Sequence, residues 1–411
     1  MKLISAELIL PIIGSPIKQG AVLIRDKKIA ELGSRKELKR KYPQVKEFHY
    51  SLLMPSLINA HCHLELSGIG LIRSKDFVSW LIQLIKEKKA QDLLKVEQNA
   101  LKEIAQSLKQ GITSFGDIIS ERVMFRVHQV SSSFSTLFWE LIGMREVEIE
   151  EKLKNVKTIF GGFNYQLGEH KLGLSPHSPY TVHKEFFRVV KKFAQGHKLC
   201  LCTHLAESKP ELELIKTGGG EIFTQLYPAV NWQEIKPEAN WVSPVQYLSE
   251  IIDDNLSLVH CVEVNDEEIE IIRKARAVIH CPRSNLNLLG KLEPVPKMLK
   301  AKIPVGLGTD SSASAGDFNL WEEMKKVLEL RDQYPGGKVQ EFDILKMATI
   351  NSARAIFREK EVGSIEPGKL ANLLGLNISP LPKELEEICS FLIESGERAV
   401  SGVFLGGERI N

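Results

Sequence analysis

The chain has 411 residues, of which 43% are hydrophobic and 26% are charged. These proportions are those of an ordinary globular protein, so they exclude a disordered chain, a collagen-like repeat and a disulfide-stapled miniprotein. The 54 basic and 52 acidic residues leave a formal net charge of +2. That balance lacks the concentrated basic footprint of a nucleic-acid-binding protein, so we expect no nucleic-acid partner. Six cysteines without a CxxC pair are typical of free thiols in the cytoplasm.

The first residues combine Lys2 with a mostly apolar run over 3–13, which has the size of the core of a secretory leader. Glu7 interrupts this run, and no small-residue cleavage site follows it. We therefore interpret residues 1–53 as short strands with polar turns. The expected strands are Leu8–Ile13, Ala21–Arg25 and Lys28–Leu32. No uncharged apolar stretch approaches the roughly 18 residues of a membrane span, so we expect a cytoplasmic protein without a membrane partner.

From about residue 54 the pattern changes to helical stretches, such as 76–89 and 96–110, that alternate with short apolar runs. The clearest of these runs are Thr113–Phe115, Leu172–Leu174, Leu199–Thr203, Ser257–His260, Ala277–His280 and Pro304–Leu307. Such alternation predicts repeated β-α units around a parallel sheet. So many units in one stretch favour a (β/α)8 barrel.

The last 50 or so residues return to strand-like segments, Ala371–Leu376 and Gly402–Leu405, followed by the turn Gly406-Gly407. The predicted fold class is therefore α/β, with a (β/α)8 barrel over residues 54–360. A small, discontinuous β-sandwich domain built from residues 1–53 and 361–411 would flank it.

The strongest local signal is His61-Cys62-His63, which ends an apolar run that begins at Leu53. Residues i and i+2 of a strand point to the same side, so His61 and His63 would present two imidazoles together. Neutral imidazoles suit zinc, iron and similar divalent ions. Barrel enzymes place their chemistry at the carboxyl ends of the strands, where this pair falls.

Three further apolar runs end in a residue of the same kind, namely His204, His260 and Asp310. His61, His63, His204 and Asp310 could together supply three imidazoles and a carboxylate. A catalytic site of this kind keeps an open position for water, and the metal would activate that water near neutral pH.

Proton transfer in such a site needs a shuttle. Glu207, three residues after His204, could hydrogen-bond both the water and an acceptor atom of the substrate. His260 would lie beside the water and stabilise the charge that develops there. An acid favoured by a helix N-terminus is the alternative interpretation of Glu207.

This pattern resembles the amidohydrolase superfamily, in its branch of nucleobase and nucleoside deaminases and chlorohydrolases. The matching segments are Pro55–His63, Ser175–Tyr180, His204–Ser208, Val259–Cys261, His280–Asn285, Gly308–Asp310 and Gly363–Asn372. Members of this superfamily are (β/α)8 barrels flanked by a small β-sandwich from both chain ends. Asn372 stands where the family usually has an aspartate, at a position outside the site.

The resemblance implies a single metal, because no lysine stands where two-metal members carry a carboxylated lysine. The implied ligands are His61, His63, His204 and Asp310. Glu207 resembles the proton shuttle of the family, His260 the histidine that orients the water, and Asp310 also a second proton acceptor. Zinc is the expected divalent ion, and the ligand set accepts iron as well. A homodimer is compatible with the resemblance.

Within the branch, the segments 64–67, 77–81 and 403–410 resemble aminodeoxyfutalosine deaminases of the futalosine route to menaquinone. The expected partner is thus a small-molecule nucleoside, 6-amino-6-deoxyfutalosine, which would be converted to futalosine and ammonia. Related enzymes deaminate S-adenosylhomocysteine, methylthioadenosine or guanine, or remove chloride from triazines, and these activities stay open. A non-catalytic scaffold would lack ligands, and none is lacking here.

Six side chains are candidates for contacts with the substrate. They are Glu65, Trp80, Arg145, His177, Arg283 and Ser314. By resemblance, His177 matches a histidine that contacts the ribose or the base. Either arginine could pair with the benzoate of aminodeoxyfutalosine, because a guanidinium fork suits a carboxylate. Glu65 has the alternative of a solvent-facing loop acid, and Trp80 that of core packing.

The segment between His204 and His260 is long for one β-α unit and contains Trp232 and Trp241. Insertions on this face of a barrel commonly form lids or the rim of a pocket. The two tryptophans could cover an aromatic substrate or pack within a helical insert, and we favour packing.

Overall fold

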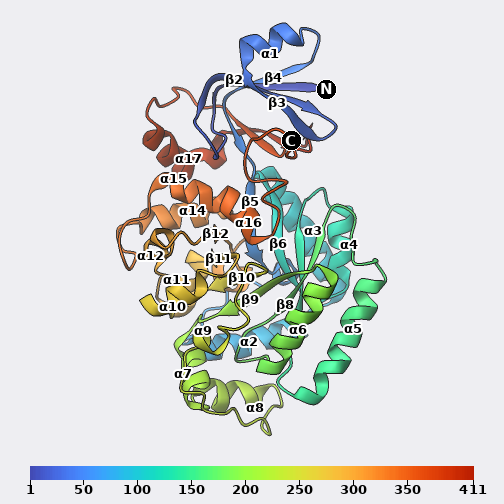
Figure 1. Cartoon of the computed structure of the whole chain (residues 1–411), viewed down its shortest axis with the longest axis vertical. Helices are drawn as coiled ribbons and strands as arrows, with labels where there is room; N and C mark the ends of the chain where they lie inside the picture. Colours follow the sequence, from blue (N-terminus) through green and yellow to red (C-terminus); the bar gives the residue numbers. More distant parts are fainter.

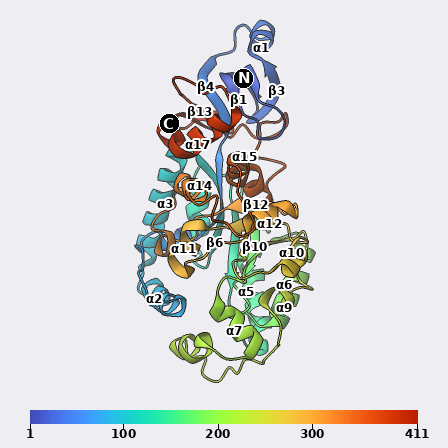
Figure 2. The same ribbon diagram turned by 90° about the vertical axis from the view of Figure 1, so that its left-hand side faces the viewer.

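The computed structural model describes residues 1–411 and contains two sheets, which Figures 1 and 2 show one above the other along the long axis. One sheet has eight parallel strands that follow each other in chain order. They are β5 (Leu57–Cys62), β6 (Ile112–Ile119), β7 (Thr136–Leu141), β8 (Lys171–Pro176), β9 (Cys200–Leu205), β10 (Leu256–His260), β11 (Ala277–His280) and β12 (Val305–Leu307). Helices alternate with these strands, so the predicted α/β class and eight-stranded barrel are confirmed.

The helices of the first half surround strands β5 to β9. They are α2 (Phe77–Lys89), α3 (Leu93–Lys109), α4 (Val123–Val130), α5 (Ile149–Gly161), α6 (Lys184–His197) and the short η1 (Leu64–Leu66) and η2 (Glu146–Glu148). Those that follow β9 are α7 (Lys209–Thr217), the π-helix η3 (Ile222–Leu226), α8 (Tyr227–Ala229), α9 (Pro244–Tyr247), α10 (Asp266–Ile272), α11 (Pro282–Leu289), α12 (Val295–Lys300), α13 (Ser312–Ala315), α14 (Leu320–Glu329), α15 (Glu341–Lys346), the π-helix η4 (Met347–Asn351) and α16 (Ser352–Ala355).

The barrel closes where the end of β12 meets β5. The backbone amides of Thr309 and Asp310 both donate to the carbonyl of His61, each at 3.0 Å. Gly308 permits this approach, because a Cβ at that position would lie 2.8 Å from the Cβ of His61. Closure therefore brings the first and last strands of the barrel, and the polar residues at their ends, into direct contact.

The second sheet has seven strands drawn from both ends of the chain, in the order β15-β14-β13-β4-β1-β2-β3. They are β1 (Lys2–Ile9), β2 (Ile17–Arg25), β3 (Lys28–Ser34), β4 (Glu47–Pro55), β13 (Leu373–Leu376), β14 (Val400–Leu405) and β15 (Glu408–Arg409), with α1 (Arg35–Lys41) and α17 (Leu385–Ala399) beside them. The sheet curls, since the rings of Phe48 and Phe404 lie 5.6 Å apart although β13 separates their strands. Both termini of the chain lie in this upper part of the molecule (Figure 1).

The amino ends of the barrel strands are closed by residues 353–358. Ala353, Ala355 and Ile356 join the apolar cluster that fills the barrel interior. Thr136 and Ser257, at the starts of β7 and β10, donate to the carbonyls of Ile356 and Ala355 at 2.6 and 2.7 Å. This end of the barrel is thus sealed by matched apolar and polar contacts.

A separate apolar cluster, here called the cap, covers the opposite, carboxyl end of the strands. It joins the loops after β5, β8, β9 and β12 and comprises Leu66, Ile69, Ile72, Phe77, Val78, Trp80, Leu81, Tyr180, Leu214, Ile222, Leu226, Tyr227 and Ala313. The insert between His204 and His260 supplies four of these residues, from α7, η3 and α8. Trp232 packs on Tyr227 with a centroid distance of 5.5 Å, whereas Trp241 is 75% exposed. Trp232 therefore packs within the insert, as expected, whereas Trp241 does not.

Several local expectations differ from the structure. The first strand is β1, not Leu8–Ile13, because β2 and β4 pair with residues 2–9 and Pro11 has no amide to continue the ladder. β7 and α17 were not anticipated from the sequence.

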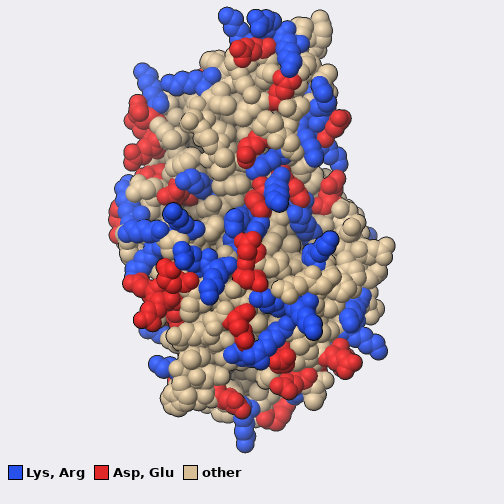
Figure 3. Space-filling model, viewed as in Figure 1, with Lys and Arg blue, Asp and Glu red and all other residues tan.

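All six cysteines are free and buried, as expected. None of the helices combines the length and the apolar character that a membrane crossing requires. Basic and acidic side chains are interspersed on the face in Figure 3.

Candidate metal centre

Five polar side chains converge at the carboxyl ends of β5, β9, β10 and β12. His61, His63 and Asp310 have ligand atoms within 4.8 Å of one another, and so do His61, His204 and His260. All five are buried. The i, i+2 spacing of β5 places the rings of His61 and His63 5.0 Å apart, as the strand periodicity predicts. The four strand ends singled out in the sequence thus meet in one place.

The distances suit a cation in the middle of this cluster. The Nε2 atoms of His61 and His204 lie 3.2 Å apart, and Asp310 Oδ1 lies 3.6 and 3.5 Å from Nε2 of His61 and His63. His204 Nδ1 donates to the carbonyl of His177 at 3.0 Å, which leaves the lone pair of its Nε2 facing the centre. A bound metal would use such a lone pair, and a backbone partner on the other ring nitrogen is the usual support of a histidine ligand.

Burial sets the ionisation of these groups. It lowers the pKa of His61 to about 4 and lowers the pKa values of His63 and His204 as well, so the three imidazoles are neutral at pH 7. Burial opposes ionisation of Asp310, but the neighbouring imidazoles of His61 and His63 hold its pKa well below the ordinary value. Three neutral imidazoles and one carboxylate form a donor set that fits a divalent transition metal.

Glu207 lies at the edge of the same cluster. Its Oε1 is 3.5 Å from His260 Nε2, and burial raises its pKa to about 8. Glu211, fully buried on α7, accepts the amides of Ala206 and Glu207 at 3.1 and 2.7 Å. These two hydrogen bonds fix the loop that carries Glu207. The raised pKa lets the Glu207 carboxyl group exchange a proton near neutral pH.

The backbone turns sharply at three of the strand ends. Ala206, His260, Cys261 and Asp310 have φ values of 50°, 71°, 50° and 60°, in the left-handed region that non-glycine residues seldom adopt. Strained conformations of this kind concentrate at functional sites, where surrounding contacts hold them. Here the turns direct His260 and Asp310 towards the cluster.

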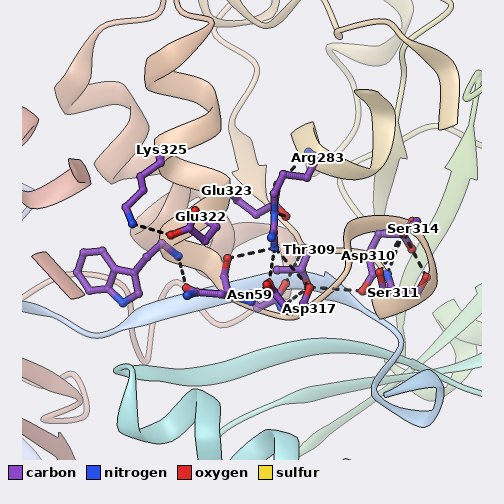
Figure 4. Close-up of polar contacts among 12 residues, drawn as sticks. Asn59, Arg283, Thr309, Asp310, Ser311, Ser314, Asp317, Glu322, Glu323 and Lys325 are labelled. Carbon is purple, nitrogen blue, oxygen red and sulfur yellow. Dashed lines mark hydrogen bonds and ion pairs between the residues drawn. The ribbon is translucent and has the colours of Figure 1, made fainter. Parts of the chain in front are cut away.

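Ser314 contacts Asp310. Its hydroxyl donates to Asp310 Oδ2 at 2.8 Å, and Ser284 donates to the same oxygen at 2.7 Å. Figure 4 shows Ser311, Ser314 and Asp310 grouped in one loop. The two hydroxyls hold Oδ2, so Oδ1 is the oxygen that faces His61 and His63. From the sequence, Ser314 is a candidate substrate contact, and no pattern assigns a role to Ser284.

Glu65 has its partners within the protein. Its carboxylate accepts the amide and the hydroxyl of Ser120, both at 2.8 Å, and the amide of Glu121 at 3.1 Å. Lys88 Nζ lies 2.7 Å from the same carboxylate. Glu65 is buried rather than solvent-facing, and these contacts tie the loop after β6 to that after β5.

Three other candidates also have partners away from the centre. Trp80 is buried in the cap, and its Nε1 donates to the carbonyl of Ala313 at 3.2 Å. Arg145 pairs with Glu148 and Glu234, at the outer edge of the insert. Arg283 pairs with Glu323 and Asp317, each at 2.7 Å (Figure 4). Glu148 lies three residues after Arg145, whereas Glu234, Asp317 and Glu323 lie on other elements, which no local sequence pattern connects to the two arginines.

His177 is the candidate that does lie beside the cluster. Its ring centroid is 4.8 Å from that of His204, and its Nδ1 is hydrogen-bonded to Thr181 at 2.7 Å. The residue is half-buried, whereas the five side chains of the cluster are buried.

The sequence is similar to known proteins over most of its length. Residues 52–410 match the Amidohydrolase family, and residues 20–44 match a bacterial imidazolonepropionase-like composite domain. The 5-methylthioadenosine/S-adenosylhomocysteine deaminase of Thermoanaerobacter pseudethanolicus is 30% identical over 341 residues, 79% of this chain and 73% of that protein. The 5'-deoxyadenosine deaminase of Methanopyrus kandleri is 28% identical over 375 residues, 87% and 81% of the two chains. The aminodeoxyfutalosine deaminase of Deinococcus radiodurans is 28% identical over 349 residues, 82% and 81%.

Solved structures have the same architecture. Helicobacter pylori aminofutalosine deaminase in complex with methylthio-coformycin has a TM-score of 0.86 and 26% identity, with 100% of both chains covered. A zinc-bound adenosine deaminase from Xanthomonas campestris has a TM-score of 0.83 and 22% identity, with 99% and 92% covered, and this second likeness concerns the fold alone.

Proposed function

The chain belongs to the amidohydrolase family and is a metal-dependent hydrolytic deaminase of adenine-type nucleosides, and we propose that its substrate is 6-amino-6-deoxyfutalosine. The reaction would replace the exocyclic amine at C6 of the purine with oxygen from water and release ammonia. In this proposal His61, His63, His204 and Asp310 hold one divalent ion.

Zinc is the ion we propose, because the donor set is rich in imidazole and the structurally similar adenosine deaminase carries zinc. When bound, the metal would act as a Lewis acid and make water acidic enough to react near neutral pH. The close Nε2 atoms of His61 and His204, with Asp310 Oδ1 near Nε2 of His61 and His63, are the structural observations that fit such an ion.

We assign the proton transfers to Glu207. As a carboxylate it would take a proton from the attacking water and deliver it to N1 of the ring, and later supply one to the departing amine. A pKa of about 8 lets the group hold and give up a proton at little cost near pH 7. His260, 3.5 Å from Glu207, would orient the water through its Nε2. His177, whose ring lies 4.8 Å from that of His204, is the side chain we assign to the ribose or the base.

The observation that carries the choice of substrate is the match to the Helicobacter pylori aminofutalosine deaminase, which covers both chains completely at 26% identity. The Deinococcus radiodurans relative supports the same choice. If the benzoate binds near Arg145, the guanidinium must exchange Glu234 or Glu148 for the substrate.

The test is ammonia release from metal-replete protein given aminodeoxyfutalosine, 5'-deoxyadenosine, methylthioadenosine, S-adenosylhomocysteine, guanine and a chlorotriazine, with chloride measured for the last. We expect the highest kcat/KM with aminodeoxyfutalosine. A preference for another compound would reject the substrate and retain the metal chemistry.

A second candidate substrate is an uncharged adenine nucleoside such as 5'-deoxyadenosine or methylthioadenosine. The ion pairs of Arg145 and Arg283 favour it, because neither guanidinium is free to bind a carboxylate. The panel separates the two candidates by their kcat/KM values on the parent protein. If Arg145 binds the benzoate, Arg145→Ala should lower kcat/KM for aminodeoxyfutalosine and leave that for 5'-deoxyadenosine unchanged.

A further inference from the structure

The helix that follows β11, α11, contacts a polar residue at the end of each neighbouring strand, Asp310 after β12 and His260 on β10. β11 lies between β10 and β12 in the barrel, yet its own terminal residue, His280, lies outside the cluster and bonds to Tyr334 at 2.9 Å. The contacts come from Ser284 and Asn285, which are fully buried near the start of α11. They reach in opposite directions, to Asp310 after β12 and to His260 at the end of β10.

The contacts are specific to single atoms. Ser284 Oγ donates to Asp310 Oδ2 at 2.7 Å, and Asn285 Oδ1 lies 2.9 Å from His260 Nδ1. Because the amide oxygen only accepts, it selects the form of His260 that carries hydrogen on Nδ1. The lone pair of Nε2 then faces Glu207. The amide nitrogen of Asn285 is buried without a partner, so the oxygen contact is its single polar function.

The preceding residue anchors this turn. The amide of Arg283 donates to Glu323 at 3.0 Å, and its Nε donates to the second oxygen of that carboxylate at 2.7 Å. Glu323 is fully buried on α14. The turn therefore cannot shift without breaking a backbone hydrogen bond and an ion pair to the same carboxylate, which makes it a rigid support.

We propose that Ser284 and Asn285 are paired positioning residues that fix Asp310 and His260 relative to each other across β11. The inference rests on the proposed metal-dependent function. Ser284 restricts the carboxylate so that Oδ1 points to the metal position. Asn285 sets the tautomer and the ring plane of His260. Outer contacts of this kind commonly change metal affinity or activity by about 10- to 100-fold when they are lost.

The Ser284 part of the proposal is tested by zinc affinity, measured by chelator competition on metal-free protein. Ser314 bonds the same oxygen, so Ser284→Ala alone should weaken affinity several-fold, and Ser284→Ala with Ser314→Ala by about 100-fold. Ser284→Thr keeps the hydroxyl and should retain affinity. Ser107→Ala, a buried serine of α3, is the control. Affinity of the double variant within twofold of the parent would overturn this part.

The Asn285 part is tested by 15N NMR of histidine-labelled, metal-free protein, with His260→Gln identifying the signal. The parent should show hydrogen on Nδ1 of His260, Asn285→Ala should lose that preference, and Asn285→Asp, which keeps an acceptor oxygen, should retain it. Asn372→Ala is the matched control, because Asn372 is also buried with its amide nitrogen unpartnered and its oxygen bound, to the amide of Gly406. An unchanged tautomer in Asn285→Ala would overturn this part.

Kinetics add a third readout. Asn285→Ala should lower kcat by about 10- to 100-fold with KM within twofold, because the loss affects the reacting centre rather than binding. Affinity and NMR need no substrate, so they decide the positioning role even if the parent protein deaminates none of the nucleosides. That outcome would reject the proposed function alone.

Discussion

The two ends of the barrel strands are built for opposite purposes. At the amino ends, hydroxyls of Thr136 and Ser257 donate to carbonyls of residues 355–356, and apolar side chains fill the space beneath them. At the carboxyl ends, imidazoles and carboxyls crowd together, the backbone takes positive φ values, and Glu207 has a raised pKa. One end satisfies its polar groups within the protein, whereas the other leaves them facing a common centre.

This difference shows how the fold can tolerate a strained site. The satisfied contacts at the amino ends stabilise the folded barrel. This stability can offset the energetic cost of the strained backbone at the carboxyl ends of the same strands. Substitutions at the two ends should therefore separate stability from activity, and the predictions below test that separation.

The largest effect is expected from Glu207→Gln. The amide cannot carry a proton between water and the ring, so kcat should fall by about 10²- to 10⁴-fold while bound metal stays stoichiometric. Ammonia release and metal analysis check this result. Glu213→Gln, on the exposed face of α7, is the control and should keep full activity. Full activity of Glu207→Gln would contradict the shuttle assignment.

At the amino ends, Ile356→Ala should reduce the free energy of unfolding by about 2–5 kcal/mol, because it leaves a cavity in the closed base of the barrel. Urea denaturation measures this loss. Below the unfolding transition, kcat should remain within twofold of the parent. A large fall in kcat without a loss of stability would show that the two ends are not separable.

The pH dependence of stability should reveal the burial of Glu207. Its pKa is about 8 in the folded protein and 4.5 without burial, so the unfolded chain ionises first as pH rises. Metal-free protein therefore loses stability between about pH 4.5 and 8, by at most about 1.4 kcal/mol per pH unit from this group.

Glu207→Gln removes this dependence. In urea denaturation of metal-free samples, the variant should become increasingly more stable than the parent from pH 5 to pH 8, by a few kcal/mol at the upper limit. Equal pH profiles of the two proteins would show that the carboxyl group is not desolvated.

The smallest effect concerns the cap. Asp76 accepts the amide of Ser79 at 2.7 Å and begins α2, the helix that carries Trp80. Asp76→Ala should cost about 1 kcal/mol in unfolding free energy, since one N-cap bond is lost. Asp76→Asn keeps an oxygen for the N-cap hydrogen bond and should cost less than half as much. Destabilisation well above 2 kcal/mol would indicate that the cap supports the whole barrel.

Much of the barrel and its centre could be predicted from the sequence because both depend on local order. Apolar runs with a polar residue at the end predict barrel strands, and here those end residues are His61, His204, His260 and Asp310. Parallel strands in a closed barrel necessarily bring those ends together. β7 was missed because its apolar run, Leu137–Trp139, is short and is followed by Glu140.

The substrate contacts were harder to predict because they depend on partners far away in the chain. Glu65 is satisfied by residues some 55 positions later, and Arg283 by Glu323, 40 positions later. No local pattern distinguishes a carboxylate that has such partners from one that is free. The same holds for Ser284 and Asn285, whose roles appear only when β10, β11 and β12 stand side by side.

The sequence by itself determined the alternation of strands and helices, the identity of the donor atoms and the strand ends on which they stand. Periodicity and residue chemistry suffice for these, because each is a property of a few adjacent residues. Only the tertiary structure decided which oxygen of Asp310 faces the centre, which nitrogen of His260 is bound by Asn285, and which charged side chains are already paired. Those properties arise from contacts between distant segments, and closure of the barrel is what brings the segments together.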